Sequence, residues 1–155
     1  MTTILIVGTG SVGKRHAKNF AELGYKISCV DPRKDRVSEL SDEIKVEYTY
    51  ETLNSALDGG ETYSGLVICS PPKFHVDQSC ASLDRGIPVL LEKPVSKTIK
   101  EAGILKNALN NSEIRGGPHL LLGYTWRWSP ELIYLKQLYS LSADQPMTLP
   151  PVFEL

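Results

Sequence analysis

The sequence predicts an α/β fold in which helices cover both faces of a doubly wound parallel sheet. Short apolar segments alternate along the chain with longer segments of helical spacing, which is typical of this class. The segment 65–69 is almost entirely apolar, as expected of a parallel strand that is buried on both faces. A glycine-rich turn at residues 8–13 lies between the first apolar segment and the first helical one. Together these observations favour parallel strands joined by helical crossovers.

Six strands and six helices are expected along the chain. Gly24 and Gly86 follow helical segments and mark their C-terminal ends. In the first helix, Val12, Phe20 and Leu23 are expected to point inward. The strands are expected at about residues 3–8, 26–31, 46–48, 65–69, 87–91 and 119–124, and the helices at about 12–23, 34–40, 53–57, 74–85, 99–110 and from 130 onward. Such crossovers predict the strand order 3-2-1-4-5-6.

The composition is that of an ordinary globular protein, and it argues against several classes of function. The 155 residues are 41% hydrophobic and 23% charged with a net charge of −1, so no overall field favours nucleic acid or an anionic membrane. The chain enters a strand directly and holds no long apolar run, so neither a secretory signal nor a membrane span is expected. Its three cysteines, Cys29, Cys69 and Cys80, suggest buried, reduced thiols and a cytoplasmic location rather than disulfides or a metal site.

The glycine-rich turn Gly8-Thr9-Gly10-Ser11-Val12-Gly13 has the spacing of a cradle for a pyrophosphate. The first glycine permits the tight turn, the second lets the backbone approach a ligand, and the third lets the helix pack closely on the strand. Backbone N–H groups at Ser11 and Val12 then face the ligand, and the positive end of the helix dipole favours an anion. The turn therefore predicts a dinucleotide site at the start of the first helix.

A second signal is Asp31, at the end of the second expected strand. An acidic residue about 20 residues after the glycines can accept hydrogen bonds from the adenosine ribose. The alternative is that Asp31 and Pro32 only start a turn. A competing motif overlaps the first one, because Gly8, Gly13 and Lys14 match the beginning of a P-loop. That loop needs Ser or Thr next, to hold magnesium, and Arg15 stands there, so we exclude it.

Two more segments lie where expected strands end, which is where an open α/β sheet binds ligands. Cys69-Ser70-Pro71-Pro72 ends the fourth strand, and Glu92-Lys93-Pro94 follows the fifth. The prolines leave few free N–H groups and form a stiff wall beside a cofactor. Since these segments, the glycine turn and Asp31 all belong to one edge of the sheet, we expect them to form one site.

With these motifs the chain resembles the N-terminal domain of the glucose–fructose oxidoreductase, inositol dehydrogenase and MocA-type oxidoreductases. The resemblance covers residues 1 to about 130. It rests on the glycine turn, on Asp31 with Arg36, on Ser70-Pro71-Pro72 with His75, on Glu92-Lys93-Pro94, and on Gly123-Tyr124-Thr125-Trp126-Arg127-Trp128. The Glu-Lys-Pro triplet after an apolar strand is the most specific of these motifs.

The resemblance implies NAD(P)-dependent hydride transfer at a carbinol carbon of a sugar, cyclitol or nucleotide sugar. Lys93 would be catalytic, because its ammonium would stabilise negative charge on the carbinol oxygen and help to move its proton. Glu92 would orient Lys93 or contact the nicotinamide ribose, and His75 would support the cofactor site. Arg36 would stack on the adenine or remain a solvated helix residue, and Arg127 would face the cleft.

NAD is the expected cofactor, because the Asp31 carboxylate would face a 2′-phosphate and repel it. Arg33 and Lys34 could neutralise that phosphate, so NADP is the alternative. His16 also matches the family, and it is expected to pack or hydrogen-bond on the first helix.

The expected organisation is a dinucleotide-binding Rossmann domain at residues 1–130, then a helix and a proline-rich tail at 131–155 that begin another domain. In the family that the chain resembles, a second α+β domain carries substrate contacts, a catalytic histidine and the oligomer interface. We expect that second domain to be absent here, and we expect this chain to be inactive alone. The expected partners of the full-length protein are a sugar-like small molecule and further copies of the protein itself. A non-catalytic NAD(H)-binding module or sensor is the alternative. An S-adenosylmethionine methyltransferase would leave the Glu-Lys-Pro triplet unexplained.

Overall fold

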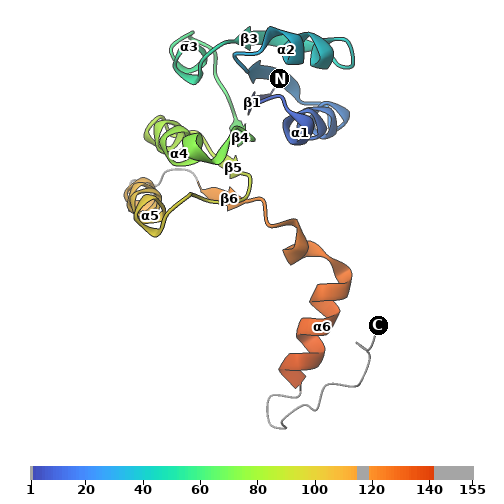
Figure 1. Ribbon diagram of the computed structural model, residues 1–155, viewed down its shortest axis with the longest axis vertical. Helices are drawn as coiled ribbons and strands as arrows, with labels where there is room; N and C mark the ends of the chain where they lie inside the picture. Colours follow the sequence, from blue (N-terminus) through green and yellow to red (C-terminus); the bar gives the residue numbers. More distant parts are fainter. Residues whose placement is uncertain (1, 115–118, 142–155) are drawn as a thin grey trace. The chain divides into compact units, whose positions relative to one another are not determined.

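A six-stranded parallel sheet forms the centre of the structure. The structure is a computed structural model, and it describes residues 2–114 and 119–141. Its strands are β1 (Thr3–Val7), β2 (Lys26–Val30), β3 (Val46–Tyr50), β4 (Gly65–Ile68), β5 (Val89–Leu91) and β6 (Leu120–Leu122). They lie in the order β3-β2-β1-β4-β5-β6, and each neighbouring pair is parallel (Figure 1). The predicted fold class and strand order are therefore confirmed.

The helices cover the two faces of this sheet. They are α1 (Ser11–Glu22), α2 (Lys34–Ser41), α3 (Leu53–Leu57), α4 (His75–Asp84) and α5 (Ile99–Ile114), with a short 3-10 turn η1 (Pro72–Phe74) before α4. Side chains of α1 and α2 share one buried cluster, and side chains of α3, α4 and α5 share another. Figure 1 shows α1 on the opposite side of the strands from α4 and α5.

The alternation of side chains along the central strand explains these two layers. In β1, Leu5 and Val7 pack toward α3, α4 and α5, whereas Ile4 and Ile6 pack toward α1 and α2. All four side chains are buried, because a strand at the centre of a doubly wound sheet has no face in water. The apolar run at residues 4–7 thus fixes β1 between the two helical layers.

A second compact unit begins at Tyr124, and the first ends at Gly123. Its described elements are a 3-10 turn η2 (Thr125–Trp128) and the helix α6 (Pro130–Leu141). Pro130 occupies the first position of α6, where a missing N–H costs no helical hydrogen bond. The exposed apolar side chains of this unit include Trp126, Leu132, Ile133, Tyr134, Leu135 and Leu138. Within the described ranges, none of the helices combines the length and the apolar character needed to span a membrane.

Several element boundaries differ from the expectations. α1 ends at Glu22, and Leu23 is 72% exposed, so the expected inward position of Leu23 was wrong. β5 begins at Val89 rather than at residue 87, and the preceding Pro88 has no N–H for a sheet hydrogen bond. β4 ends at Ile68, which leaves Cys69 in the loop beyond the strand. The expected turn at residues 116–118 lies outside the described residues.

Candidate functional site

The glycine turn after β1 is packed so tightly that residues 8 and 13 have no room for a side chain. A Cβ at Gly13 would lie 1.8 Å from the Gly8 carbonyl oxygen, so α1 can approach β1 only because residue 13 is glycine. Gly8 has a φ of +91°, and a Cβ there would lie 2.8 Å from the backbone nitrogen of Ser70. A Cβ at Gly10 would face the Arg36 guanidinium at 3.6 Å. These contacts confirm the tight turn and the close helix packing that the motif predicts.

The first turn of α1 continues this cradle. Gly10 is the N-cap residue, and among the described residues no side chain caps the helix and no acidic side chain occupies its first turn. Ser11 and Val12 are the first two residues of α1, whose N–H groups have no helical acceptor of their own. A helix start of this kind favours an anion, because both the N–H groups and the dipole attract negative charge.

Asp31 follows β2 and lies beside the glycine turn, with only 5% of its surface exposed. Its Oδ2 accepts hydrogen bonds from the backbone nitrogen of Thr9 at 2.8 Å and from Thr9 Oγ1 at 3.0 Å. Its Oδ1 accepts one from the backbone nitrogen of Arg33 at 2.9 Å. A carboxylate has about four acceptor sites, so these three bonds leave about one for a ligand hydroxyl.

A cavity of about 730 Å³ opens between these elements. Its volume is in the usual range for small-molecule sites, roughly 300–1,000 Å³. It is lined by Val7, Gly8, Gly10, Val30, Asp31, Pro32, Arg33, Arg36, Glu51, Thr52, Leu53, Cys69, Ser70, Pro71, Phe74 and Gln78. Seven of the predicted site residues are among them, namely Gly8, Gly10, Asp31, Arg36, Cys69, Ser70 and Pro71. The glycine turn, the end of β2 and the end of β4 therefore share one cavity, as the strand-end argument predicts.

Other predicted site residues do not line this cavity. Pro72 begins η1, so it starts the 3-10 turn that leads into α4. His75 is 1% exposed, and its ring lies 2.7 Å from two backbone oxygens, with Nδ1 against Pro94 and Nε2 against Ser70. Both of these oxygens are acceptors, so a ring with one N–H satisfies one of them and a ring with two satisfies both. His75 thus holds together the loops that follow β4 and β5.

The segment after β5 combines a buried carboxylate with an exposed lysine. Glu92 is 7% exposed, and its Oε2 accepts a hydrogen bond from the backbone nitrogen of Lys93 at 3.2 Å. Its Oε1 lies 2.8 Å from Nε2 of His16 in α1. The Lys93 side chain is exposed, and the Lys93–Pro94 peptide bond is cis. Glu92 is therefore hydrogen-bonded to the backbone of Lys93 and lies in contact with α1.

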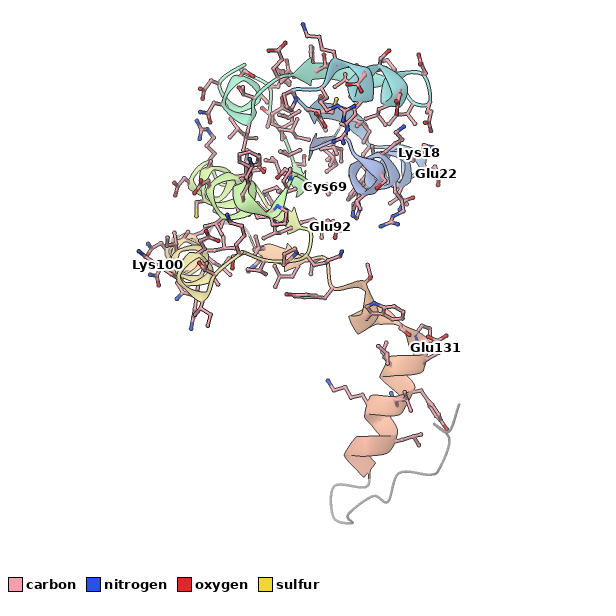
Figure 2. All side chains as sticks on the ribbon, viewed as in Figure 1. Lys18, Glu22, Cys69, Glu92, Lys100 and Glu131 are labelled. Carbon is pink, nitrogen blue, oxygen red and sulfur yellow. The ribbon has the colours of Figure 1, made fainter. Side chains whose placement is uncertain are left out.

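Cys69 and Glu92 lie where β4 and β5 end (Figure 2). Burial, and to a smaller extent the Glu92 carboxylate, raises the pKa of the Cys69 thiol to about 12. Burial likewise raises the pKa of Cys29 to about 11, with a smaller contribution from Asp31. Cys29 is buried, whereas Cys69 and Cys80 are half-buried, so the expectation of fully buried thiols is correct only for Cys29. The raised pKa values make Cys29 and Cys69 weak nucleophiles near neutral pH.

Two further predicted site residues are arginines of α2 and η2. Arg36, in α2, is half-buried and lines the cavity beside Gly10. Arg127 belongs to η2, and its side chain lies outside the described residues. Within the described residues, no group of three His, Cys, Asp or Glu side chains is placed to hold a metal ion.

Sequence reasoning missed three contributions to the site. Thr9 is buried and donates twice to Asp31, and its position between two glycines gave no signal of that contact. His16 was expected only to pack or hydrogen-bond on α1, and its partner, Glu92, is 76 residues away. Glu51 and Thr52 follow β3 and line the cavity. The strand-end rule applied to the third strand would have found them.

Residues 2–115 match the family described as "Oxidoreductase family, NAD-binding Rossmann fold". The chain belongs to this family. The packed glycine turn, the acidic residue at the end of β2 and the parallel sheet of this NAD-binding Rossmann domain agree with that membership. The family match covers all strands from β1 to β5 and the helices α1 to α5.

Relatives of this oxidoreductase-family chain include dehydrogenases. It is 34% identical over 158 residues to the rhizopine catabolism protein MocA of Rhizobium meliloti, covering 94% of this chain and 47% of that protein. It is 29% identical over 139 residues to inositol 2-dehydrogenase of Streptomyces avermitilis, covering 87% of this chain and 39% of that protein. The chain thus spans less than half the length of these curated relatives.

Solved structures show the same fold. The scyllo-inositol dehydrogenase of Lactobacillus casei, with bound NAD(H) and scyllo-inositol, superposes with a TM-score of 0.82 and 25% identity. The match covers 92% of this chain and 42% of that one. The myo-inositol 2-dehydrogenase of Lactobacillus plantarum also gives a TM-score of 0.82, at 21% identity, over 92% of this chain and 42% of its own.

Proposed function

We propose that this chain binds NAD(H) at the carboxyl ends of β1, β2 and β4 and holds it for hydride exchange with a carbinol carbon of a sugar, cyclitol or nucleotide sugar. One observation carries the proposal. The glycine turn, Asp31 and the Lys93 loop follow β1, β2 and β5 of a single parallel sheet, so all three lie along one edge. Ligands of open α/β sheets bind along this edge.

The residues of the cavity fit such a dinucleotide. The turn from Gly8 to Gly13 and the amides of Ser11 and Val12 take the pyrophosphate, because in the described residues no side chain caps the start of α1. Asp31 accepts a hydrogen bond from one ribose hydroxyl, since protein donors occupy its other acceptor sites. Arg36 stacks on the adenine.

The loop that follows β4 forms the opposite wall of the cofactor site. Cys69, Ser70 and Pro71 line the cavity, and Pro72 continues this loop into η1. The Ser70 hydroxyl donates a 2.6 Å hydrogen bond to Oε1 of Gln78, which fixes the loop against α4.

NAD is favoured over NADP by the charges around Asp31. The Asp31 carboxylate would face a 2′-phosphate, and like charges in contact repel each other. The two cations that follow it in the sequence already have carboxylate partners, because Arg33 pairs with Asp35 and Lys34 pairs with Glu51. A 2′-phosphate would have to compete with these carboxylates, although exposed pairs of this kind are weak.

Lys93 is the catalytic residue of the proposal. When bound, NAD⁺ supplies the acceptor for the hydride. The Lys93 ammonium stabilises negative charge on the carbinol oxygen and helps to move its proton. Glu92 fixes the Lys93 backbone, and His75 holds the carbonyl of Pro94, so the lysine stands on a loop that is anchored on both sides.

The substrate class is inferred from the relatives, several of which are named as inositol 2-dehydrogenases. We place the end of the cofactor domain near residue 130, with residues 131–155 beginning the next domain. The relatives are more than twice as long as the part that matches, so the contacts to the carbinol substrate other than that of Lys93, and those between copies of the protein, are assigned to segments beyond this domain.

Cofactor binding is tested by calorimetric titration with NADH, NADPH and S-adenosylmethionine. We expect saturable NADH binding, weaker NADPH binding and no heat from S-adenosylmethionine. Asp31→Asn removes the negative charge but keeps an acceptor oxygen, so it should reduce the difference in affinity between NADH and NADPH. Tighter binding of NADPH to the unaltered protein would overturn the choice of NAD, and absence of NADH binding would overturn the proposal.

Hydride transfer is tested in the full-length protein, by following NADH absorbance with NAD⁺ and a panel of cyclitols and sugars. Lys93→Ala should lower turnover at least about 100-fold, the usual contribution of a general acid–base group, while the affinity for NADH stays nearly unchanged. Unchanged turnover would remove Lys93 from the mechanism. Binding of NADH without turnover of any carbinol would favour a non-catalytic NAD(H)-binding module.

A further inference from the structure

The Lys93 side chain is exposed, so its position depends on the backbone that carries it. None of the ion pairs of the described residues involves its ammonium. A lysine with four flexible side-chain bonds is placed accurately only if its loop is held in place. The contacts on either side of Lys93 supply that support.

On the N-terminal side, Glu92 is tied to three elements. Its backbone nitrogen donates to Ile68 of β4 at 3.0 Å, and its Oε2 accepts from the backbone nitrogen of Lys93. Its Oε1 lies 2.8 Å from His16 Nε2. A Cβ at Gly123 would lie 3.1 Å from the Glu92 carboxyl carbon, so the end of the sheet closes tightly over this carboxylate. A buried carboxylate that loses its partner is strongly destabilising, so the Glu92 carboxylate depends on its contact with His16.

His16 stands on the helix that begins at the glycine turn. It follows Gly13 by three residues, so the two share a face of α1 about one turn apart. Gly13 packs on the Gly8 carbonyl, and this same face brings His16 to the end of β5. One rigid helix therefore contacts both the proposed pyrophosphate site and the carboxylate next to Lys93.

On the C-terminal side, His75 of α4 makes the matching contact. Its Nδ1 lies 2.7 Å from the Pro94 oxygen, and its Nε2 lies 2.7 Å from the oxygen of Ser70, which lines the cavity. Two histidines from two helices thus bracket Lys93, and each also reaches a segment of the proposed cofactor site.

We propose that His16 and His75 are positioning residues for Lys93, and that the His16–Glu92 contact couples occupancy of the glycine turn to the placement of the lysine. This inference rests on the role proposed for Lys93 above. Neither histidine touches the reacting atoms; His16 acts through Glu92, and His75 acts through the Pro94 carbonyl. Cofactor that orders the first turn of α1 would then tighten the Lys93 loop as well.

The two histidines use different ring nitrogens, which gives a crossed test. The amide nitrogen of glutamine reaches the place of Nε2, and that of asparagine reaches the place of Nδ1. At position 16, where Nε2 contacts Glu92, His16→Gln should preserve the contact and His16→Asn should lose it. At position 75, where Nδ1 contacts Pro94, His75→Asn should preserve the hold on the loop and His75→Gln should lose it.

The readout is hydrogen exchange of the Lys93 amide, measured by NMR with and without NADH. In each variant that loses its contact, the exchange rate of the Lys93 amide should rise about tenfold, the equivalent of one ordinary hydrogen bond. In each variant that preserves its contact, the exchange rate should stay close to that of the unaltered protein. NADH should slow the exchange in the unaltered protein and in His16→Gln, but not in His16→Asn. Lys18→Ala is the matched control on α1 (Figure 2), because Lys18 is partly exposed and its ammonium pairs with Glu43 rather than with a residue of the Lys93 segment.

Equal exchange rates of the Lys93 amide in His16→Gln and His16→Asn would overturn the coupling through Glu92. Equal rates in His75→Asn and His75→Gln would overturn the positioning role of the contact between His75 and the Pro94 carbonyl. Amides of β1 and β4 report whether each variant folds; if both variants at position 75 unfold, the pair at position 16 decides the proposal. Failure of the unaltered protein to bind NADH would defeat the proposed function and the coupling to cofactor. The positioning role of His16 and His75 would still be decided by the exchange measured without NADH.

Discussion

At the scale of single residues, the site depends on the absence of a Cβ atom at Gly13. The space that a Cβ would need is filled by the Gly8 carbonyl oxygen, only 1.8 Å away. The carbonyl belongs to the backbone and the position of a Cβ is fixed by the backbone, so neither can move aside by changing a rotamer. The close approach of α1 to β1, and with it the direction of the first helical amides, therefore requires glycine at this position.

Gly13→Ala is expected to push α1 away from β1. Overpacking of this kind costs about 1–3 kcal/mol of unfolding free energy. If the same displacement misdirects the cradle amides, the affinity for NADH should fall about 10- to 100-fold, since each tenfold step corresponds to about 1.4 kcal/mol. Urea unfolding and NADH titration measure the two effects. Unchanged affinity in a folded variant would show that the cradle tolerates the displaced helix.

The thiol at the end of β4 allows a prediction about pH. With a pKa of about 12, Cys69 exists almost entirely as the neutral thiol at pH 8. Only about one molecule in ten thousand carries the reactive thiolate, so iodoacetamide should modify Cys69 roughly a thousandfold more slowly than an ordinary cysteine. The rate should rise about tenfold per pH unit above pH 8, because the thiolate fraction rises in that proportion.

Mass spectrometry after timed alkylation separates Cys69 from the other two cysteines. Burial raises the pKa of Cys80 too, but Cys80 lies in α4 and does not line the cavity. Alkylation of Cys69 at the rate of a free peptide thiol would contradict the buried, protonated state.

At the scale of elements, most of the fold could be predicted because its signals are local. The apolar run before the glycine turn indicates β1, Gly24 ends the first helix, and the residues 53–57 form α3 as expected. Boundaries were less accurate where packing decides them. The fourth helix begins as the 3-10 turn η1, and β5 starts two residues late, at Val89.

α5 offers a prediction about its own stability, because it carries a glycine in its interior. Gly103 is exposed, and a Cβ there would have no neighbour within 4 Å. Alanine is better than glycine in a helix interior by about 0.8–1.0 kcal/mol. Gly103→Ala should therefore raise the free energy of unfolding by up to about 1 kcal/mol, as measured in urea. A loss of stability would mean that α5 packs differently from the structure, and NADH affinity should stay unchanged in this variant.

At the scale of the whole molecule, the site could be predicted in its position but not in its contacts. The strand-end rule needs only the order of elements, and it correctly placed Asp31 and Ser70 at one cavity. The pairs Thr9–Asp31 and His16–Glu92 join residues 22 and 76 positions apart. Such contacts depend on how the layers pack, which no local pattern in the chain encodes.

The same packing makes cofactor binding a test of the whole first unit. The proposed ligand contacts loops after β1, β2 and β4, which all belong to the unit that ends at Gly123, so binding should stabilise that unit as one body. At 100 times the dissociation constant, NADH should add about 2.7 kcal/mol to the free energy of unfolding. For a unit of this size that is an increase of roughly 10 °C in Tm. Differential scanning calorimetry over a range of NADH concentrations measures it, with Gly13→Ala as the variant expected to show a smaller shift. A Tm that does not depend on NADH concentration would mean that the loops after these strands do not bind the cofactor together.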